Sequence, residues 1–217
     1  MNFKKQKYTV IKNIIDIKLC KFIFDYFLLK RKVVKTLFDH KFISPFSIEW
    51  GTWSDTQVPN TYSHYADIAM ETLLQWVQPI MEKHTKLKLV PTYSYARIYK
   101  KGDVLKRHKD RFSCEISTTL NLGGDHWSIY LSPNENVGIP NDKKGITAAS
   151  NAKGVKVDLK PGDMLIYKGM ELEHWREPFE GEDCIQVFLH YNKTSKEAEL
   201  NKFDKRPHLG LPSWFKK

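Results

Sequence analysis

The stretch from residue 89 to residue 110, LVPTYSYARIYKKGDVLKRHKD, marks where the sequence changes from helical to β-strand character. Its segment Tyr93–Tyr99 is rich in tyrosine and carries an isoleucine, residue types that favour strands. The turn formers Lys101-Gly102-Asp103 follow, and the stretch ends with His108-Lys109-Asp110. A strand, a turn and two potential metal ligands therefore follow one another closely.

The rest of the second half of the chain has the same character. Short segments rich in Val, Ile, Tyr, Phe and Thr are predicted as strands: Ile116–Leu122, Trp127–Leu131, Val155–Leu159, Met164–Tyr167 and Cys184–Tyr191. Turn-forming triplets interrupt the series, at Gly123-Gly124-Asp125, Pro161-Gly162-Asp163 and Glu180-Gly181-Glu182. Strands spaced in this way are typical of a sandwich or a barrel.

The first half of the chain predicts helices behind an opening strand at Tyr8–Ile11. Apolar residues recur at helical spacing across Asp16–Leu37, which indicates an amphipathic helix. A second apolar stripe covers Ser63–His84, where Pro79 is expected to kink the helix. The predicted fold class is therefore α+β: mainly β, with N-terminal helices that precede a double-stranded β-fold.

A length of 217 residues and a hydrophobic content of 41% predict a single domain with one substantial core. Within it we expect a helical buttress with the opening strand at residues 1–88, the β core at 89–192 and an irregular polar tail at 193–217. The polar segment 132–153 is too long for a tight hairpin. We expect this segment to close over a substrate, and a tolerated insertion is the alternative.

The sequence predicts neither a membrane span nor secretion. The longest apolar stretches, such as Phe22–Leu29, are shorter than the roughly 20 residues that a membrane helix needs. The basic N-terminus leads to no signal-peptide pattern, so a cytoplasmic protein is expected. Cys20, Cys114 and Cys184 are far apart and form no CxxC pair, which argues against a disulfide framework or a structural zinc site.

The net charge of +10 is concentrated near the N-terminus, where residues 1–40 contain ten Lys and Arg residues against three Asp residues. Such a surface would attract nucleic acid by counterion release. A solvated basic helix face is the simpler interpretation, because no nucleic-acid-binding motif accompanies the charge. No pattern in the sequence defines an oligomeric state.

Three residues have the character of a metal site. In an extended segment His108 and Asp110 face the same side, so both can reach one ion. His174 follows the predicted strand Met164–Tyr167, where the chain could return beside the first pair. Two histidines and one carboxylate with open coordination positions are typical of non-haem iron(II) oxygenases, although zinc enzymes use similar sets.

The order of these motifs resembles the 2-oxoglutarate and Fe(II)-dependent dioxygenase superfamily, prolyl 4-hydroxylase-like branch. The matching elements are Tyr99-Lys-Lys-Gly102-Asp-Val-Leu105-Lys-Arg-His108-Lys-Asp110, Thr118-Thr119-Leu120-Asn121, Gly123-Gly124, Lys160-Pro161-Gly162-Asp163 and His174. The resemblance covers about residues 90 to 192. It implies a double-stranded β-helix (jelly roll) core, with iron held by His108, Asp110 and His174. It also implies 2-oxoglutarate as co-substrate and O2 as oxidant, with ascorbate in a supporting role.

The resemblance further implies a basic residue for the distal carboxylate of 2-oxoglutarate. The positions where this branch usually carries that residue are Asp183 and Cys184, and neither side chain can bind a carboxylate. Arg176 is the candidate replacement, because it lies two residues after His174 and offers bidentate geometry. The alternative is that Arg176 pairs at the surface with Glu177 or Glu180. Lys168 is a weaker candidate, and Gln186 is a neutral one.

The resemblance assigns two further contacts to the co-substrate pocket, Tyr99 and Thr119, both of which also fit ordinary strand positions. Arg111 and Trp175 flank the ligands and are expected to shape the substrate mouth or to orient the ligands. For Trp175, packing on the outer face is the favoured interpretation. Histidines outside the motifs are expected to be structural: His40, His64, His84, His126, His190 and His208.

The function implied by the resemblance is hydroxylation coupled to conversion of 2-oxoglutarate into succinate and CO2. The substrate would be a peptide or protein side chain, such as proline, or a small molecule. Oxidation of a nucleic-acid base is an alternative that the positive charge permits. A jelly-roll module that binds a metal without catalysis is a second alternative, favoured by the lack of the usual basic residue.

Overall fold

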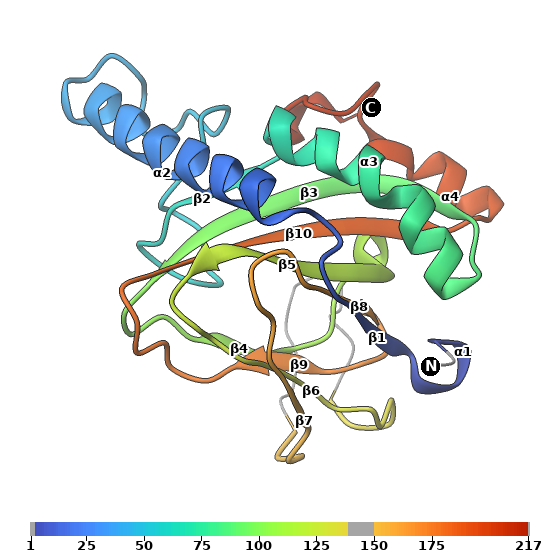
Figure 1. Ribbon diagram of the computed structural model, residues 1–217. Coiled ribbons are helices and arrows are strands. Elements are labelled where there is room, and N and C mark those ends of the chain that lie inside the picture. Colours follow the sequence, from blue (N-terminus) through green and yellow to red (C-terminus); the bar gives the residue numbers. More distant parts are fainter. Residues whose placement is uncertain (1–2, 139–149, 217) are drawn as a thin grey trace.

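The computed structural model describes residues 3–138 and 150–216, which form two antiparallel β-sheets with helices on one side (Figure 1). The chain is thus mainly β with few helices, as the sequence predicts, and its two sheets fit a jelly roll. Within the described residues, no helix has the length and apolarity that crossing a bilayer requires.

The larger sheet has six strands in the order β1-β8-β5-β10-β3-β2. Its strands are β1 (Tyr8–Ile11), β2 (Ser63–Tyr65), β3 (Leu89–Lys100), β5 (Ile116–Gly124), β8 (Met164–Lys168) and β10 (Asp183–Lys193). β10 pairs with β3 on one side and β5 on the other, and nearly all its residues are buried. This burial shows that both faces of the sheet are covered, so alternate residues face the helices and the smaller sheet.

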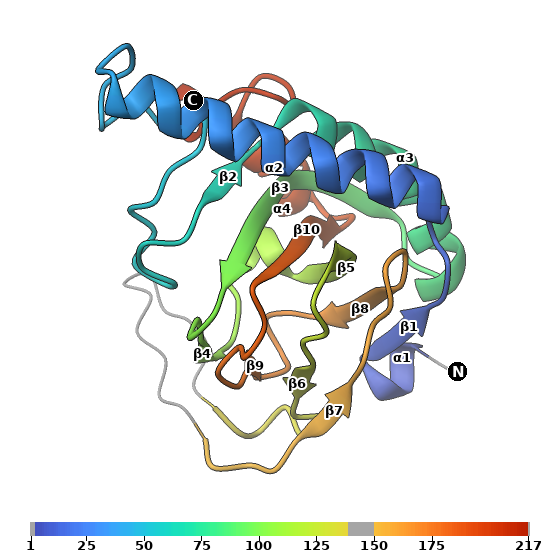
Figure 2. The same ribbon diagram turned by 60° about the vertical axis from the view of Figure 1, so that its left-hand side comes forward.

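The smaller sheet has four short strands in the order β4-β9-β6-β7 (Figure 2). They are β4 (Leu105–His108), β6 (Ile129–Leu131), β7 (Val155–Val157) and β9 (His174–Arg176). β4 and β9 pair antiparallel, with His108 opposite His174. The register of this one pair therefore brings together two histidines that are far apart in the sequence.

Helices α1 (Phe3–Gln6), α2 (Ile17–Asp39) and α3 (Ile68–Thr85) precede most of the strands. α2 lies against β5, and α3 lies against β3 and β10, on the face of the large sheet that points away from the small one (Figure 1). Each long helix begins at an aspartate whose side chain accepts hydrogen bonds from the first turn, Asp16 for α2 and Asp67 for α3. The core between these helices and the sheet includes Phe27, Met70, Leu74, Ile98, Leu120 and Val187.

Two expectations from the sequence are corrected. Residues Ser63–Tyr65 form β2, which pairs with β3, and are not the first turn of the second helix. The helix starts only at Ile68, after its cap. The tail after residue 193 is not wholly irregular, because it contains α4 (Lys196–Leu200) and two 3-10 segments, at residues 202–205 and 213–215.

The expected closing segment at 132–153 includes residues 139–149, which lie outside the described residues. The parts on either side of it are anchored to the small sheet. Ser132 N donates to Glu173 O at 2.8 Å, and Ser150 N donates to the Glu173 carboxylate at 2.7 Å. Both ends of this segment therefore lie next to His174. Its role as a lid stays a prediction.

Candidate active site

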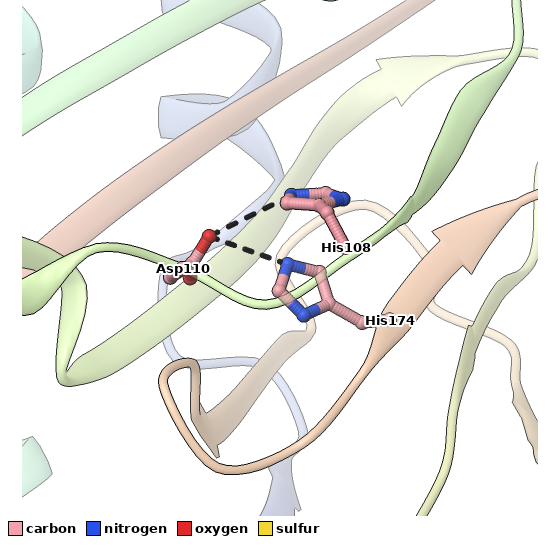
Figure 3. Close-up of side chains that lie close together, drawn as sticks. All are labelled: His108, Asp110 and His174. Atoms are coloured by element: carbon pink, nitrogen blue, oxygen red, sulfur yellow. Dashed lines mark ion pairs between the residues drawn. The ribbon is translucent and has the colours of Figure 1, made fainter. Parts of the chain in front are cut away.

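Three side chains with metal-binding atoms meet at the facing ends of β4 and β9 (Figure 3). His108 ends β4, His174 begins β9, and Asp110 follows β4 by two residues. The Asp110 Oδ1 atom lies 3.6 Å from His108 Nε2 and 3.5 Å from His174 Nε2. His108 and Asp110, predicted from their spacing, thus form a single cluster with His174, which was predicted from a distant part of the sequence.

Hydrogen bonds fix the protonation of both imidazole rings. His108 Nδ1 lies 2.7 Å from Lys106 O, and His174 Nδ1 lies 3.0 Å from Leu172 O. Because a carbonyl oxygen only accepts, each Nδ1 must carry the proton and donate it. In the neutral rings this leaves the Nε2 lone pairs directed toward Asp110, the tautomer and orientation that metal-binding histidines adopt.

The carboxylate of Asp110 is held from its other side. Its Oδ2 accepts a hydrogen bond from Ser117 Oγ at 2.7 Å, and its backbone N–H donates to Gly169 O at 2.9 Å. A Cβ atom at Gly169 would lie 2.2 Å from Asp110 Oδ2, so only glycine allows the chain to pass this close. Backbone and side-chain contacts together aim Oδ1 at the two imidazoles.

The electrostatics of the cluster follow from burial and from its one negative charge. Burial alone would raise the pKa of Asp110, but the neighbouring His174 holds it well below the usual range. Burial likewise opposes the charged form of His174, yet Asp110 raises the pKa of this imidazole above its ordinary value. Burial, followed by the effect of His174, lowers the pKa of His108 to about 4. Two imidazoles and one carboxylate are a donor set that suits a divalent transition metal.

These pKa shifts predict how metal affinity depends on pH. A metal ion must displace the proton that His174 holds below its raised pKa, so affinity should rise with pH up to that pKa by about tenfold per pH unit and then level off. The stability of the metal-free protein should change in the opposite sense, because a raised pKa contributes stability below about pH 6.5 that is lost as the pH rises through the folded-state value. Calorimetric titration with Ni2+ between about pH 6 and about pH 8 measures the first effect. Affinity that does not change with pH would show that His174 releases no proton on binding.

A cavity of about 200 Å3 opens on the three side chains. Its wall includes residues that no sequence argument assigned to a site, among them Asp55, Gln57, Tyr93, Tyr95, Tyr167 and His190. Strand alternation could have revealed several of them. Tyr93 and Tyr95 share a strand face with the predicted residue Tyr99, and His190 shares one with Gln186. His190, expected to be structural, therefore lies in the wall of the candidate site.

Strand alternation could not have revealed Gln57, because this residue lies in an irregular segment between α2 and β2. Its Nε2 lies 3.2 Å from His108 Nε2, and its Oε1 accepts a hydrogen bond from Arg97 Nη1 at 3.2 Å. Arg97, only 1% exposed, forms an ion pair with Asp55 of the same segment. The Gln57 amide thus occupies the lone pair of His108 that a metal ion would use.

Replacing Gln57 with alanine should therefore strengthen metal binding. The metal no longer has to break the amide contact with His108, which as a neutral hydrogen bond contributes about 1 kcal/mol, so affinity should rise roughly fivefold. Gln78→Ala is the matched control, since its side chain bonds Leu89 O on the helical side of the large sheet. Competition with a chromogenic chelator gives the affinities. A lower affinity in Gln57→Ala would mean that this amide supports the metal site.

Arg176 occupies the interior between the sheets. It is 1% exposed, and it donates from Nη1 to Trp127 O at 2.5 Å and from Nη2 to Thr119 Oγ1 at 3.2 Å. Thr119 Oγ1 also donates to Gln186 Oε1 at 2.9 Å. Tyr99 packs its ring edge-on against Trp127, with 4.7 Å between centroids. The structure therefore brings Tyr99, Thr119 and Gln186, the three other residues predicted for the co-substrate, close to the guanidinium group of Arg176.

This guanidinium group has no carboxylate partner among the described residues, and its Nε has no hydrogen-bond partner there at all. The alternative of surface pairing with Glu177 or Glu180 is wrong, because the side chain points inward and Glu177 instead accepts from Trp175 Nε1 at 2.8 Å. Burial lowers the pKa of Arg176, as expected for a cation far from water. A buried cation without an anion is costly, so a small anionic ligand bound beside this guanidinium group would be stabilised.

Three other residues singled out from the sequence have different surroundings. Lys168 pairs with Glu171 at 2.8 Å, so it is not the counterpart of a buried anion. Arg111 lines the cavity and forms an ion pair with Asp204 at 2.9 Å. Trp175 points to the outer face of the small sheet, where it stacks on Tyr130 with 5.7 Å between centroids. The favoured interpretation of Trp175 as outer-face packing is thus consistent with its position.

Comparison with known proteins finds likeness in structure only. No protein-family model matches the chain, and no curated protein sequence does. Among solved structures, a prolyl-4-hydroxylase from Pseudomonas putida matches with 14% identity and a TM-score of 0.51, over 89% of this chain and 96% of that one. HygX from Streptomyces hygroscopicus, with nickel and 2-oxoglutarate bound, matches with 14% identity and a TM-score of 0.59, over 88% and 85%.

The epimerase SnoN from nogalamycin biosynthesis, described as non-haem and α-ketoglutarate-dependent, also matches. It has 12% identity and a TM-score of 0.60, over 97% of this chain and 90% of that one. At such identities the likeness concerns the fold alone. The chain has the fold of this prolyl-4-hydroxylase, of HygX and of SnoN, as the resemblance in its sequence implied.

Proposed function

We propose that this chain is an Fe(II)- and 2-oxoglutarate-dependent dioxygenase with a double-stranded β-helix core, acting as a single domain over residues 1–217. The observation that carries the proposal is a pair of sites in one interior. His108, Asp110 and His174 form a cluster that could hold a metal ion, and the buried cation of Arg176, two residues after His174, has no anionic partner among the described residues. The shared fold with 2-oxoglutarate-dependent enzymes adds support.

The residues present fit both groups. His108, Asp110 and His174 would hold Fe(II), because their donor set is that of non-haem iron enzymes and both neutral imidazoles carry the proton on Nδ1, which leaves the lone pair on Nε2. Arg176 would bind the distal carboxylate of 2-oxoglutarate, with Thr119 beside it, since among the described residues its Nε is an unused donor and its charge has no counterion. Tyr99 and Gln186 would complete this pocket.

When bound, iron, 2-oxoglutarate and O2 would supply an oxidant that hydroxylates a substrate, with release of succinate and CO2. The protein's own contribution is to hold the ligands, exclude water and orient the substrate. Leu105 and Tyr167 wall the cavity beside the ligands, and the Tyr167 ring lies edge-on to His174 with 4.7 Å between centroids. This packing restricts the His174 ring to one orientation and limits access of water.

The substrate is a small molecule or a peptide side chain. The nucleic-acid alternative loses most of its support, because six of the ten basic residues in 1–40 lie within salt-bridge distance of a carboxylate: Lys7, Lys12, Lys21, Lys30, Arg31 and Lys35. Their charge is largely balanced within the fold. The cavity of about 200 Å3 suits a side chain or a small ring.

Release of succinate from 2-oxoglutarate, with Fe(II) and ascorbate present, tests the proposal. The wild-type chain should release succinate, and His108→Ala should not. His84→Ala, a change of an exposed histidine on α3, is the matched control and should keep the wild-type rate. Equal rates for His108→Ala and the wild type would refute the dioxygenase proposal.

Thermal unfolding, combined with the succinate assay, separates the proposal from a non-catalytic binding module. A module that only holds a metal would bind Ni2+ through His108, Asp110 and His174 but would not be stabilised by 2-oxoglutarate. An enzyme of the proposed kind should show a higher melting temperature when 2-oxoglutarate is added to the Ni2+-loaded protein. Metal binding without that increase, and without succinate release, would favour the binding module.

A further inference from the structure

His190, near the end of β10, lies in the cavity wall beside the metal-ligand cluster. Its ring packs against Tyr93 with 4.6 Å between centroids, and its Nδ1 lies 3.0 Å from Ser117 Oγ. The same hydroxyl oxygen lies 2.7 Å from Asp110 Oδ2 and 2.8 Å from Cys114 O. Three polar atoms therefore surround one hydroxyl group.

The number of available protons decides which way these hydrogen bonds run. A serine hydroxyl has one proton to donate and two lone pairs to accept with. The ionised Asp110 carboxylate and the Cys114 carbonyl oxygen can only accept, so they compete for the single proton of Ser117. The contact with His190 is a hydrogen bond only if Nδ1 carries a proton and donates it to Oγ. The ring of His190 is therefore the Nδ1–H tautomer.

This tautomer leaves a lone pair on His190 Nε2. Burial lowers the pKa of His190 to about 4, so the ring is neutral near neutral pH. Nε2 meets no hydrogen-bond partner among the described residues, and it is not one of the fully buried polar atoms without a partner. Since His190 lines the cavity, this nitrogen offers an open acceptor to whatever enters.

The charged groups of the same cavity wall are already paired. Asp55 of the wall forms an ion pair with Arg97 behind it, and Arg111 forms one with Asp204. Arg111 reaches both oxygens of that carboxylate, at 2.9 and 3.0 Å. Apart from the metal-ligand cluster, each charged group of the described wall thus has an ion-pair partner, and Asp204 also pairs with Lys216 at 2.7 Å. His190 is a neutral side chain of this wall that can take part in a hydrogen bond.

We propose that His190 is a specificity-determining residue whose Nε2 accepts a hydrogen bond from a neutral O–H or N–H group of the substrate, next to the carbon that is oxidised. This inference rests on the proposed function. An acceptor at this position would bind an alcohol or a secondary amide better than a prolyl ring, because a prolyl residue has no N–H and its ring carries only C–H groups. The substrate class is therefore a neutral molecule with a hydrogen-bond donor near the reacting carbon.

Nitrogen-15 NMR of the full chain, loaded with Zn2+ and 2-oxoglutarate, tests the inference directly. The Nε2 resonance of His190 should have the chemical shift of an unprotonated ring nitrogen, and Nδ1 that of a protonated one. Cyclopentanol and cyclopentanone are matched probes, since they have nearly the same size and only the alcohol has a donor. Cyclopentanol should move the Nε2 resonance in a saturable way, and cyclopentanone should leave it in place.

Two substitutions separate the two nitrogens of the ring. His190→Asn keeps an amide near the position of Nδ1, so it can still contact Ser117, but it has nothing at the position of Nε2. His190→Gln instead places its amide near the position of Nε2 and has no polar atom at the position of Nδ1. Cyclopentanol should bind His190→Asn roughly tenfold more weakly than the wild type, and His190→Gln should recover part of this loss. Resonances of residues around the cavity report binding in both variants.

Four results would overturn the inference: a protonated Nε2, no response to cyclopentanol, an equal response to cyclopentanone, or unchanged affinity in His190→Asn. None of these measurements requires turnover. A chain that releases succinate but has a protonated Nε2 would keep the proposed function and lose this inference. A chain without succinate release would lose the proposed function whatever the state of His190.

Discussion

Replacing Asp110 with asparagine is expected to lower the affinity for a divalent metal ion by more than about 100-fold and to abolish succinate release. The carboxylate is the only negative charge among the three ligands, and its Oδ1 lies 3.5 Å from His174 Nε2. Asparagine keeps the shape but removes this charge. Because losing an outer partner of a ligand already costs about 10- to 100-fold, losing the charge of the ligand itself should cost more. Calorimetric titration with Ni2+ measures the loss.

A graded series controls this experiment. Ser117→Ala removes only the hydrogen bond to Asp110 Oδ2, so its affinity should fall by about 10- to 100-fold. Asp158→Asn changes an exposed carboxylate of the small-sheet side and should bind metal like the wild type. Asp110→Asn should also lower the pKa of His174, because burial then acts without the opposing negative charge, and NMR titration follows this change. If Asp110→Asn kept metal affinity within tenfold of the wild type, Asp110 would not be a ligand.

Arg176→Met is expected to raise the KM for 2-oxoglutarate by roughly 30-fold or more, because removing one partner of a buried charge pair costs about 2–5 kcal/mol. The stability of the protein without co-substrate should not suffer from the same substitution. Arg176 has no carboxylate partner among the described residues, so an apolar side chain of similar length should leave the stability of the protein without co-substrate unchanged or higher. Succinate release gives KM, and thermal unfolding gives both stabilities.

Two further variants make this result specific. Arg107→Met removes an arginine whose guanidinium lies over the Trp175 ring at 3.5 Å on the outer face of the small sheet, so it should leave KM unchanged. Arg176→Lys keeps the charge without the bidentate geometry and should fall between the wild type and Arg176→Met. An unchanged KM in Arg176→Met would remove Arg176 from the co-substrate site.

The sequence was most informative where chemistry and local geometry coincide. His108 and Asp110 are two residues apart, and an extended backbone brings such residues to one side without help from the rest of the chain. The inward direction expected for Arg176 had the same basis, because it lies two residues after His174. The structure has Arg176 buried and Trp175, between them, on the outer face.

Sequence reasoning was least informative where residues depend on distant partners. β2 has only three residues, and pairing with β3 accounts for their extended form, so they gave no strand pattern of their own. The segment that carries Asp55 and Gln57 has no periodicity. Its position over His108 depends on contacts with Arg97 of β3. Nothing local to that segment indicates where it would lie.

The sequence by itself determined the secondary structure in outline, mainly strands after the N-terminal helices. It also determined the functional groups: two imidazoles and a carboxylate able to bind a metal, and an arginine on the same strand face as His174. These properties depend on residue type and on neighbours a few positions away. Only the tertiary structure decided which groups meet. Pairing of β4 with β9 brings His108 beside His174. Within the part of the chain that the structure describes, the fold also leaves Arg176 without a counterion and His190 Nε2 open to the cavity. Such contacts join distant parts of the chain, so their geometry is set by sheet register and core packing, which no local pattern records.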